Sequence, residues 1–208
     1  CHAQGIRPII GCEVYVATHT RFDRRPQLDD SQYHLVLLAE NEVGYKNILQ
    51  LVSKGFTEGF YYKPRVDREL LARHSKGIIA LSACLAGEIP QLILKPNFKE
   101  AREPALYYQN IFGPDNFFLE VQDHGIAEQK EVNQHIFSLS RELGIPIVAT
   151  NDLHYINQTE ADVHDVLLCI QTGKTLADAD RMRFPSNEFY LKSGEEMFQL
   201  FIFAPEAL

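Results

Sequence analysis

The sequence has few cysteines, no long apolar run and no excess of positive charge. Its cysteines are scattered and form no C-x-x-C pair, which favours a reducing cytoplasm over a disulfide framework; they are Cys1, Cys12, Cys84 and Cys169. No apolar stretch approaches the roughly 18 residues needed to span a membrane. The net charge of −8 means that the chain as a whole does not attract nucleic acid, so any contact with DNA must be local.

What is present predicts an α/β fold. The 208 residues, 45% of them hydrophobic, can bury a sizeable core in one large domain or two small ones. Strand-like runs separated by helical patterns predict a parallel sheet wrapped by helices, open or closed into a barrel. The strand-like runs are Pro8–Ala17, Tyr33–Ala39, Gly77–Ala83, Asn116–Gln122 and Ile145–Thr150.

Helical patterns lie between most of these runs, and the polar segment Thr18–Gln32 is predicted to be a surface excursion. Pro104 should interrupt one of the helices, and Thr159-Glu-Ala-Asp162 resembles a capping box that opens another, which Gly173 closes. The expected helices are Asn41–Lys54, Asp67–His74, Ala86–Leu94, Phe98–Ile111, Val132–Leu143, Thr159–Gln171 and Glu195–Leu200.

The start of the sequence looks like the end of a helix. Gly5-Ile-Arg-Pro-Ile-Ile10 echoes Gly144-Ile-Pro-Ile-Val148, and Gly144 follows an amphipathic helix. Glycine is common just past a helix C-terminus because it accepts the left-handed backbone. We therefore expect Cys1–Gln4 to be the last turn of a helix, and the chain to be a fragment of a longer protein.

The segment Thr150-Asn-Asp-Leu-His154 carries the strongest chemical signal. The apolar run before it ends in Asp152 and His154, which are two residues apart. Alternating residues of an extended segment point the same way, so both side chains can converge on one metal ion. Alternatively, Asp152 caps the next turn and His154 is a surface histidine.

Three further metal-capable residues lie on predicted strands, namely Glu13, His34 and Cys84. Glu13 stands inside an apolar strand, where burial is costly without a partner. Each has a plain alternative: an arginine can pair with Glu13, His34 can be a satisfied core histidine, and Cys84 can be a small buried hydrophobe. Five such residues in one α/β unit nevertheless favour a metal site.

The donor types predict the metal and the reaction. Imidazole, thiolate and carboxylate ligands together suit zinc, manganese or iron. Such ions activate water and hold phosphate oxygens, which is phosphoesterase chemistry. One difficulty concerns geometry, because barrel ligands should lie at the C-terminal ends of strands. Glu13 is instead in mid-strand and His34 precedes its apolar run.

Other signals are weaker. Glu120, Asp123 and His124 end a strand and are candidates for the rim of the site, with a solvated turn as the alternative. Gly173-Lys-Thr175 lacks the first glycine of a phosphate-binding loop. The remaining candidates are expected to be structural histidines or part of a solvated loop that could touch a nucleic-acid backbone: His74, His135, His164, Arg181, Arg183 and Phe184.

Several motifs occur in one order along the chain, namely Gly11-Cys-Glu-Val-Tyr15, His34-Leu-Val-Leu-Leu38, Leu81-Ser-Ala-Cys84, Phe118-Leu-Glu120, Thr150-Asn-Asp-Leu-His-Tyr155, His164-Asp-Val-Leu-Leu-Cys-Ile-Gln-Thr-Gly-Lys174, Arg181-Met-Arg-Phe-Pro185 and Phe189-Tyr-Leu-Lys-Ser193. Taken together, they resemble a known family, the polymerase and histidinol phosphatase (PHP) domain found at the N-terminus of the bacterial replicative DNA polymerase III alpha subunit. The resemblance covers essentially the whole chain.

The resemblance implies a distorted (β/α)7 barrel, incomplete at the N-terminus, that fills residues 1–175, with residues 176–208 ending the domain and leading toward a polymerase domain. By motif position its metal ligands are Glu13, His34, Cys84, Asp152 and His154, the last two also catalytic. The His-x-His pair and Asp-His-Gly motif of the family do not occur before Glu13. About five of some nine ligands are therefore present, and the chain is expected to be inactive alone.

The function implied by the resemblance is that of a metal-dependent 3′–5′ exonuclease or phosphoesterase module within a replicative DNA-directed DNA polymerase. Polymerisation itself, with two magnesium ions, would lie beyond Leu208. The implied partners are DNA, the sliding clamp and a proofreading exonuclease, without a membrane. Two alternatives remain open: a non-catalytic scaffold that stabilises the polymerase or docks the proofreading exonuclease, and a free-standing phosphatase of the histidinol-phosphatase type.

Overall fold

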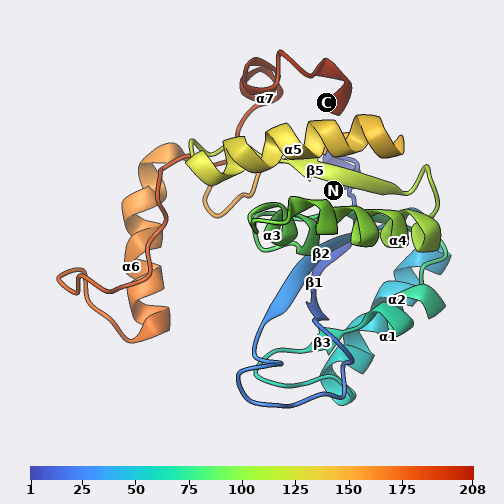
Figure 1. Ribbon diagram of the computed structural model, residues 1–208. Coiled ribbons are helices and arrows are strands. Elements are labelled where there is room, and N and C mark those ends of the chain that lie inside the picture. The colour runs from blue at the N-terminus through green and yellow to red at the C-terminus, as the bar shows by residue number, and fades with distance from the viewer.

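The computed structural model describes residues 1–208, which form one six-stranded sheet with helices packed on it (Figure 1). The strands lie in the order β3-β1-β2-β4-β5-β6, so β3 and β6 are the two edges. The predicted α/β class is confirmed, and only β3 has no counterpart among the predicted strands. The bounds are β1 Gly11–Ala17, β2 Gln32–Ala39, β3 Arg65–Val66, β4 Ile78–Leu81, β5 Phe117–Val121 and β6 Ile147–Ala149.

Strand β2 runs opposite to both of its neighbours. It pairs antiparallel with β1, with His34 opposite Tyr15, and antiparallel with β4, with Val36 opposite Leu81. The pairs β1–β3, β4–β5 and β5–β6 are parallel. The expectation of a parallel sheet is therefore wrong at β2. No helix separates β1 from β2, and antiparallel neighbours need no crossover helix.

The helices follow the predicted patterns closely. A 3-10 turn, η1 (His2–Gln4), precedes Gly5, whose φ of 70° matches the 67° of Gly144 after α5. The other 3-10 turns are η2 Phe98–Ala101, η3 Gln158–Glu160 and η4 Pro205–Ala207. The α-helices are α1 Glu42–Thr57, α2 Arg68–Arg73, α3 Glu88–Ile93, α4 Arg102–Phe112, α5 Ala127–Leu143, α6 Ala161–Thr172 and α7 Gly194–Leu200.

Two predicted helix signals need correction. Pro104 does not interrupt a helix, because it lies in the first turn of α4, where a missing N–H costs no hydrogen bond. The break comes earlier, where η2 passes into α4. The capping box before α6 is formed by Asn157 and Glu160, not by Thr159 and Asp162.

One buried core joins the sheet to its helices. Helix α1 packs against β1 to β4, and α4 and α5 pack against β5. Leu37, Leu51 and Phe117 are fully buried there, and each contributes about 1.5–3 kcal/mol of hydrophobic free energy. Phe201 and Ala204, close to the C-terminus, belong to the same core. The domain boundary at residue 175 stays a prediction.

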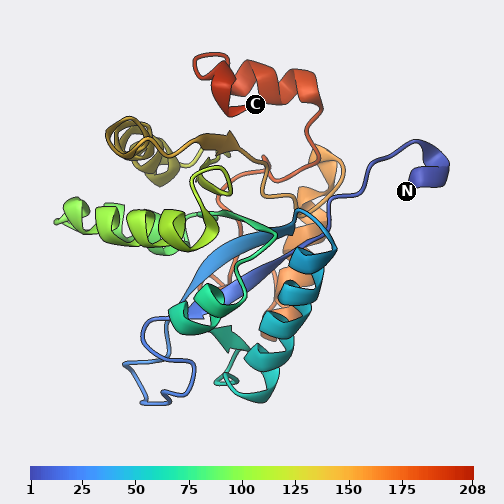
Figure 2. The ribbon, with the colours of Figure 1, turned by 90° about the vertical axis from the view of Figure 1, so that its right-hand side faces the viewer.

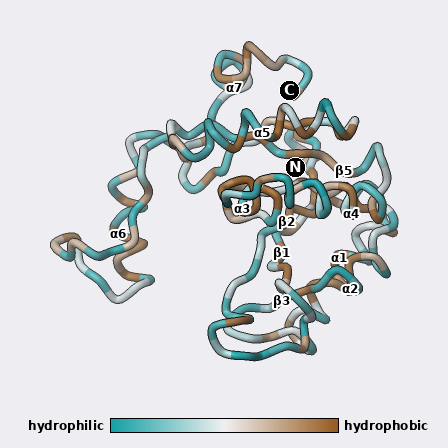
Figure 3. Tube along the Cα trace, in the orientation of Figure 1, coloured by the Kyte–Doolittle hydropathy of each residue, from teal (hydrophilic) through white to brown (hydrophobic).

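Helix α6 stands apart from this core. In Figure 1 it lies to one side of the sheet and the other helices, in the turned view of Figure 2 it lies behind them, and Figure 3 shows apolar segments on it. Val163, Leu167 and Ile170 are 61%, 56% and 72% exposed, although they share one helical stripe. The apolar face of α6 is thus uncovered. No helix of the molecule is both long and apolar enough to pass through a bilayer.

A buried arginine fixes the loop between β1 and β2. The Arg65 guanidinium donates hydrogen bonds to the carbonyl oxygens of Arg21, Asp23, Asp29 and Gly59, at 3.3, 2.7, 3.1 and 3.1 Å. Four neutral acceptors thereby replace the water lost on burial. The loop is a surface excursion, as predicted, but its backbone is tied to the end of β3.

Candidate metal centre

The first group of candidate ligands comes from three neighbouring strands. Glu13 on β1 is opposite Val36, so it is a diagonal neighbour of His34 on the same face of the sheet. The chain leaving β4 then runs beside the start of β2, where the His34 N–H donates to the Ala86 carbonyl at 3.0 Å. That contact brings Cys84 to the same place.

The three side chains converge on one another. His34 Nδ1 lies 2.9 Å from Glu13 Oε1 and 3.8 Å from Cys84 Sγ, and all three possible ligand atoms lie within 4.8 Å of one another. Hydrogen bonds to Cys84 and to Glu13 raise the pKa of His34 to about 10 against the opposing effect of burial. Without a metal, therefore, this histidine keeps a proton that holds the three groups together.

The reversal of β2 removes the geometric difficulty at His34. Because β2 is antiparallel to β1 and β4, its first residues lie at the end where those strands finish. His34 is therefore at the C-terminal rim of the neighbouring strands although it precedes its own apolar run. Glu13 remains within β1, and its side chain is 46% exposed, so it is not a buried charge.

The donor set of this group suits a transition metal. A carboxylate, an imidazole and a thiol within 4.8 Å are the ligand types of zinc, manganese and iron sites. Binding would require loss of the proton that His34 carries, so metal and proton compete for the same nitrogen. The metal identity stays a prediction.

Asp152 and His154 form a second group on the irregular segment after β6. His154 Nε2 lies 3.2 Å from Asp152 Oδ1. Burial raises the pKa of Asp152, but the hydrogen bond from His154 and the charges of His154, His124 and His34 outweigh it, and the pKa is lowered. That all five residues bind metal stays a prediction.

His124 supports this second group and is more than a rim residue. It is 1% exposed and stacks on Phe189, with ring centroids 4.3 Å apart and planes 2° apart. Gln129 Nε2 lies 2.9 Å from the ring Nδ1, while the ring Nε2 lies 3.3 Å from Asn151 Oδ1 and accepts a hydrogen bond from the Asp152 N–H at 3.2 Å. Burial lowers the pKa of His124, in keeping with a neutral ring. This ring contacts Asn151, the residue that precedes Asp152.

Asp123 and Glu120, the other two candidates for the rim of the site, have separate roles. Asp123 accepts a hydrogen bond from the Gly125 N–H at 2.9 Å, so it shapes the turn. Glu120 is buried at the end of β5, and burial raises its pKa against the hydrogen bonds from Thr150 and Gln122. Its second carboxylate oxygen has no partner. Glu120 is therefore buried beneath the rim of the site. In the sequence it lies between the two groups of candidate ligands.

Among the histidines expected to be structural, His164 is the exception. Its ring centroid lies 5.4 Å from that of His154, and Phe184 contacts both rings. No local pattern predicts this contact, because His164 is on α6 and Phe184 comes twenty residues later. His74, in contrast, is 3.3 Å from Asn47, away from the candidate ligands.

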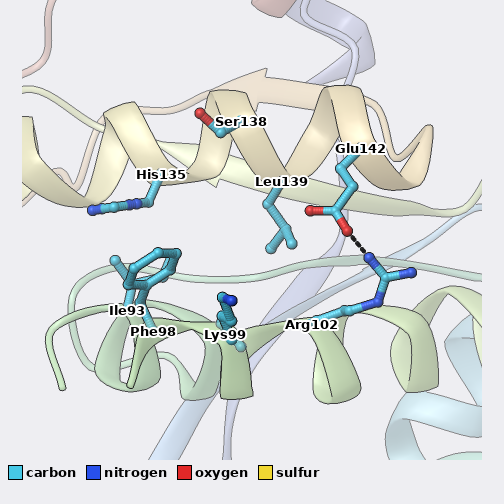
Figure 4. A pocket seen from close by; sticks show the side chains of 9 residues that line it. Ile93, Phe98, Lys99, Arg102, His135, Ser138, Leu139 and Glu142 are labelled. Carbon is cyan, nitrogen blue, oxygen red and sulfur yellow. Dashed lines mark ion pairs between the residues drawn. The ribbon is translucent and has the colours of Figure 1, made fainter. Parts of the chain in front are cut away.

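A cavity of about 330 Å³ lies elsewhere, between α5 and the η2–α4 segment (Figure 4). His135 packs against Phe98 there, with ring centroids 4.7 Å apart, and an ion pair between Arg102 and Glu142 spans the opening. None of the five candidate ligands lines this cavity. His135 therefore lies away from the candidate ligands.

Comparison with known proteins fits this geometry. Residues 1–124 match the PHP domain family, which is more than half of the 208 residues. The chain belongs to this family. The open six-stranded α/β sheet of this PHP domain is consistent with the barrel type expected for such domains.

Curated relatives extend the match to nearly the whole chain. DNA polymerase III subunit alpha of Treponema pallidum is 52% identical over 207 residues, 99% of this chain. The proteins of the same name from Borreliella burgdorferi and Thermus aquaticus are 48% and 50% identical over 98% and 94% of it. This PHP domain spans only 18%, 18% and 16% of the length of those three relatives.

Proposed function

We propose that this PHP domain is part of a replicative DNA-directed DNA polymerase, the alpha subunit of DNA polymerase III, and that it hydrolyses phosphodiester bonds at 3′ ends of DNA. The polymerase assignment draws on the 40–52% identity to proteins of that name. The hydrolytic assignment draws on the convergence of Glu13, His34 and Cys84. We place the protein in the cytoplasm, with DNA, the sliding clamp and a proofreading exonuclease as partners.

The candidate site residues have different proposed roles. Glu13, His34, Cys84, Asp152 and His154 would hold zinc, manganese or iron, which when bound supply Lewis-acid polarisation of phosphate oxygens. The Asp152 carboxylate keeps the His154 imidazole oriented through the 3.2 Å contact. An oriented imidazole beside a scissile bond can take up and return a proton.

The test uses the full-length polymerase that contains this domain. It compares the wild type with the variant Asp152→Asn, which keeps the shape of the side chain and removes its charge. We expect the variant to lose bound metal and 3′–5′ degradation of single-stranded DNA, while polymerisation on a primed template stays within about twofold. Metal per chain is measured by elemental analysis. His135→Gln, a histidine change in the remote cavity, is the matched control and should change neither property.

The outcomes separate the alternatives. Full metal and full degradation in Asp152→Asn would sink the catalytic assignment. A folded, metal-free wild-type protein would favour the non-catalytic scaffold. Hydrolysis of small phosphate monoesters without attack on DNA would favour the histidinol-phosphatase type.

A further inference from the structure

A second cavity adjoins the Asp152–His154 pair. It has a volume of about 230 Å³ and lies between the first half of α6 and residues 181–187. Its lining includes His164, Arg183 and Phe184. The candidate metal ligands do not line it, but His154 contacts Phe184 and His164 edge-on or tilted, with centroid separations of 4.6 and 5.4 Å. The cavity therefore opens beside the reacting groups.

The two arginines of this cavity differ in their partners. Arg181 is partly buried and committed to an ion pair with Asp165 on α6. Arg183 is exposed and forms neither an ion pair nor a hydrogen bond, although it lines the same cavity. A free guanidinium at the mouth of a cavity offers paired N–H donors to a phosphate oxygen.

Aromatic rings also line the cavity. The ring of Phe184 packs against that of His164, with centroids 4.7 Å apart, and against that of Phe189 outside the lining, at 4.5 Å. Flat rings of this kind stack on nucleobases without regard to sequence.

Size and charge limit what the cavity can take. Its volume of about 230 Å³ is below the roughly 300–1,000 Å³ of common ligand pockets, so a single nucleoside suits it better than a base pair. Its charged residues are Asp162, Asp165, Arg181 and Arg183, two of each sign, which sum to zero. A neutral cavity with one free cation suits one phosphodiester and gives no preference for a polyphosphate.

We propose that this cavity binds the 3′-terminal nucleotide of the strand being degraded, with its phosphate on Arg183 and its base against Phe184 and His164. The proposal rests on the proposed 3′–5′ nuclease function. It adds a substrate subsite whose residues are not metal ligands. Arg183 is accordingly a substrate-binding residue, and Phe184 also positions the ring of His154.

The experiment compares Arg183→Ala with Arg141→Ala, a surface arginine on α5, in the intact protein. Elemental analysis first checks that both variants keep the wild-type metal content. We expect Arg183→Ala to raise the KM for 3′–5′ degradation of single-stranded DNA by about tenfold or more, the loss of roughly one charge-assisted hydrogen bond, with kcat within about twofold. Binding of thymidine 5′-monophosphate, followed by saturation-transfer NMR, should weaken in parallel.

Phe184→Leu serves as a second variant that keeps the apolar volume, and it should weaken nucleotide binding. Equal KM values for Arg183→Ala, Arg141→Ala and the wild type would overturn the subsite and leave the nuclease function standing. If the wild type binds thymidine 5′-monophosphate through Arg183 but degrades no DNA, the subsite stands and the nuclease function fails. Absence of both binding and degradation overturns both.

Discussion

The two groups of candidate ligands are built in different ways. Glu13 and His34 sit on paired strands, and the segment carrying Cys84 bonds to the start of β2. Asp152 and His154 lie on an irregular segment after β6, outside the sheet, that is held by separate contacts to His124, Phe189 and Tyr190. A backbone ladder resists the loss of any one side chain, whereas a segment held by few contacts opens locally at low cost. The first group should therefore be robust and the second easily loosened.

The largest effect is expected at the centre of the first group. His34→Ala removes the nitrogen that lies between Glu13 and Cys84. Metal binding to a four-ligand site is worth about 10–16 kcal/mol, so one ligand accounts for roughly 3–4 kcal/mol, a loss of some 100- to 1,000-fold in affinity. Competition with a chelator measures it, and His135→Ala is the control. Unchanged affinity would remove His34 from the ligand set.

The second group can be loosened without touching a candidate ligand. Phe189 is 4% exposed and stacks on His124, while its backbone oxygen accepts from the His154 N–H at 2.9 Å. Phe189→Ala should cost about 3 kcal/mol of unfolding free energy and should speed hydrogen exchange in residues 150–156. Urea unfolding and exchange mass spectrometry measure the two effects. Equal exchange gains in β1 and β2 would contradict the contrast between the groups.

A smaller effect is expected from His124→Phe, which keeps a flat ring against Phe189 but removes both ring nitrogens. Gln129 and Asn151 then lose their partners, at a cost of about 1–3 kcal/mol. Metal bound by Asp152 should weaken more than metal bound by His34, which spectroscopic titration with cobalt can resolve. His74→Phe, a change outside the site, should leave both unchanged.

The smallest effect is a pH dependence at Glu120. Its pKa in the folded protein is raised above the ordinary 4.5 by burial, so the folded state binds its proton more tightly than the unfolded state does. Stability from this group is therefore full below that value and is lost as pH rises through the raised pKa. Glu120→Gln should become progressively more stable relative to the wild type as the pH rises above 4.5. A constant difference in urea midpoints would contradict this.

Much of this architecture can be read from the sequence, but the direction of β2 cannot. The apolar run of β2 predicts a strand, and alternation of apolar residues is the same in either direction. Its reversal is set by the pairing with β1 and β4, which only the folded chain reveals. Strand β3, with two residues, is too short to show any period.

The parts of the candidate site that single residues reveal could be predicted from the sequence. The parts that depend on contacts between distant segments could not. Glu13, His34 and Cys84 are visible because metal-capable side chains are conspicuous on apolar strands. His124 is predicted only as a candidate for the rim and His164 only as a structural histidine, because their contacts are with Phe189 and Phe184, far along the chain. Stacking between aromatic rings leaves no local pattern in a sequence.

The tethering of the β1–β2 loop by Arg65 has a consequence for proteolysis. The loop carries Arg21, Arg24 and Arg25, but Pro26 follows Arg25, so it contains two bonds that trypsin recognises, after Arg21 and after Arg24. A protease must pull several residues into an extended form, which would here strip a buried guanidinium of its carbonyl partners. The loop should survive digestion in the native protein, and its cleavage would report the release of β3 from the sheet edge.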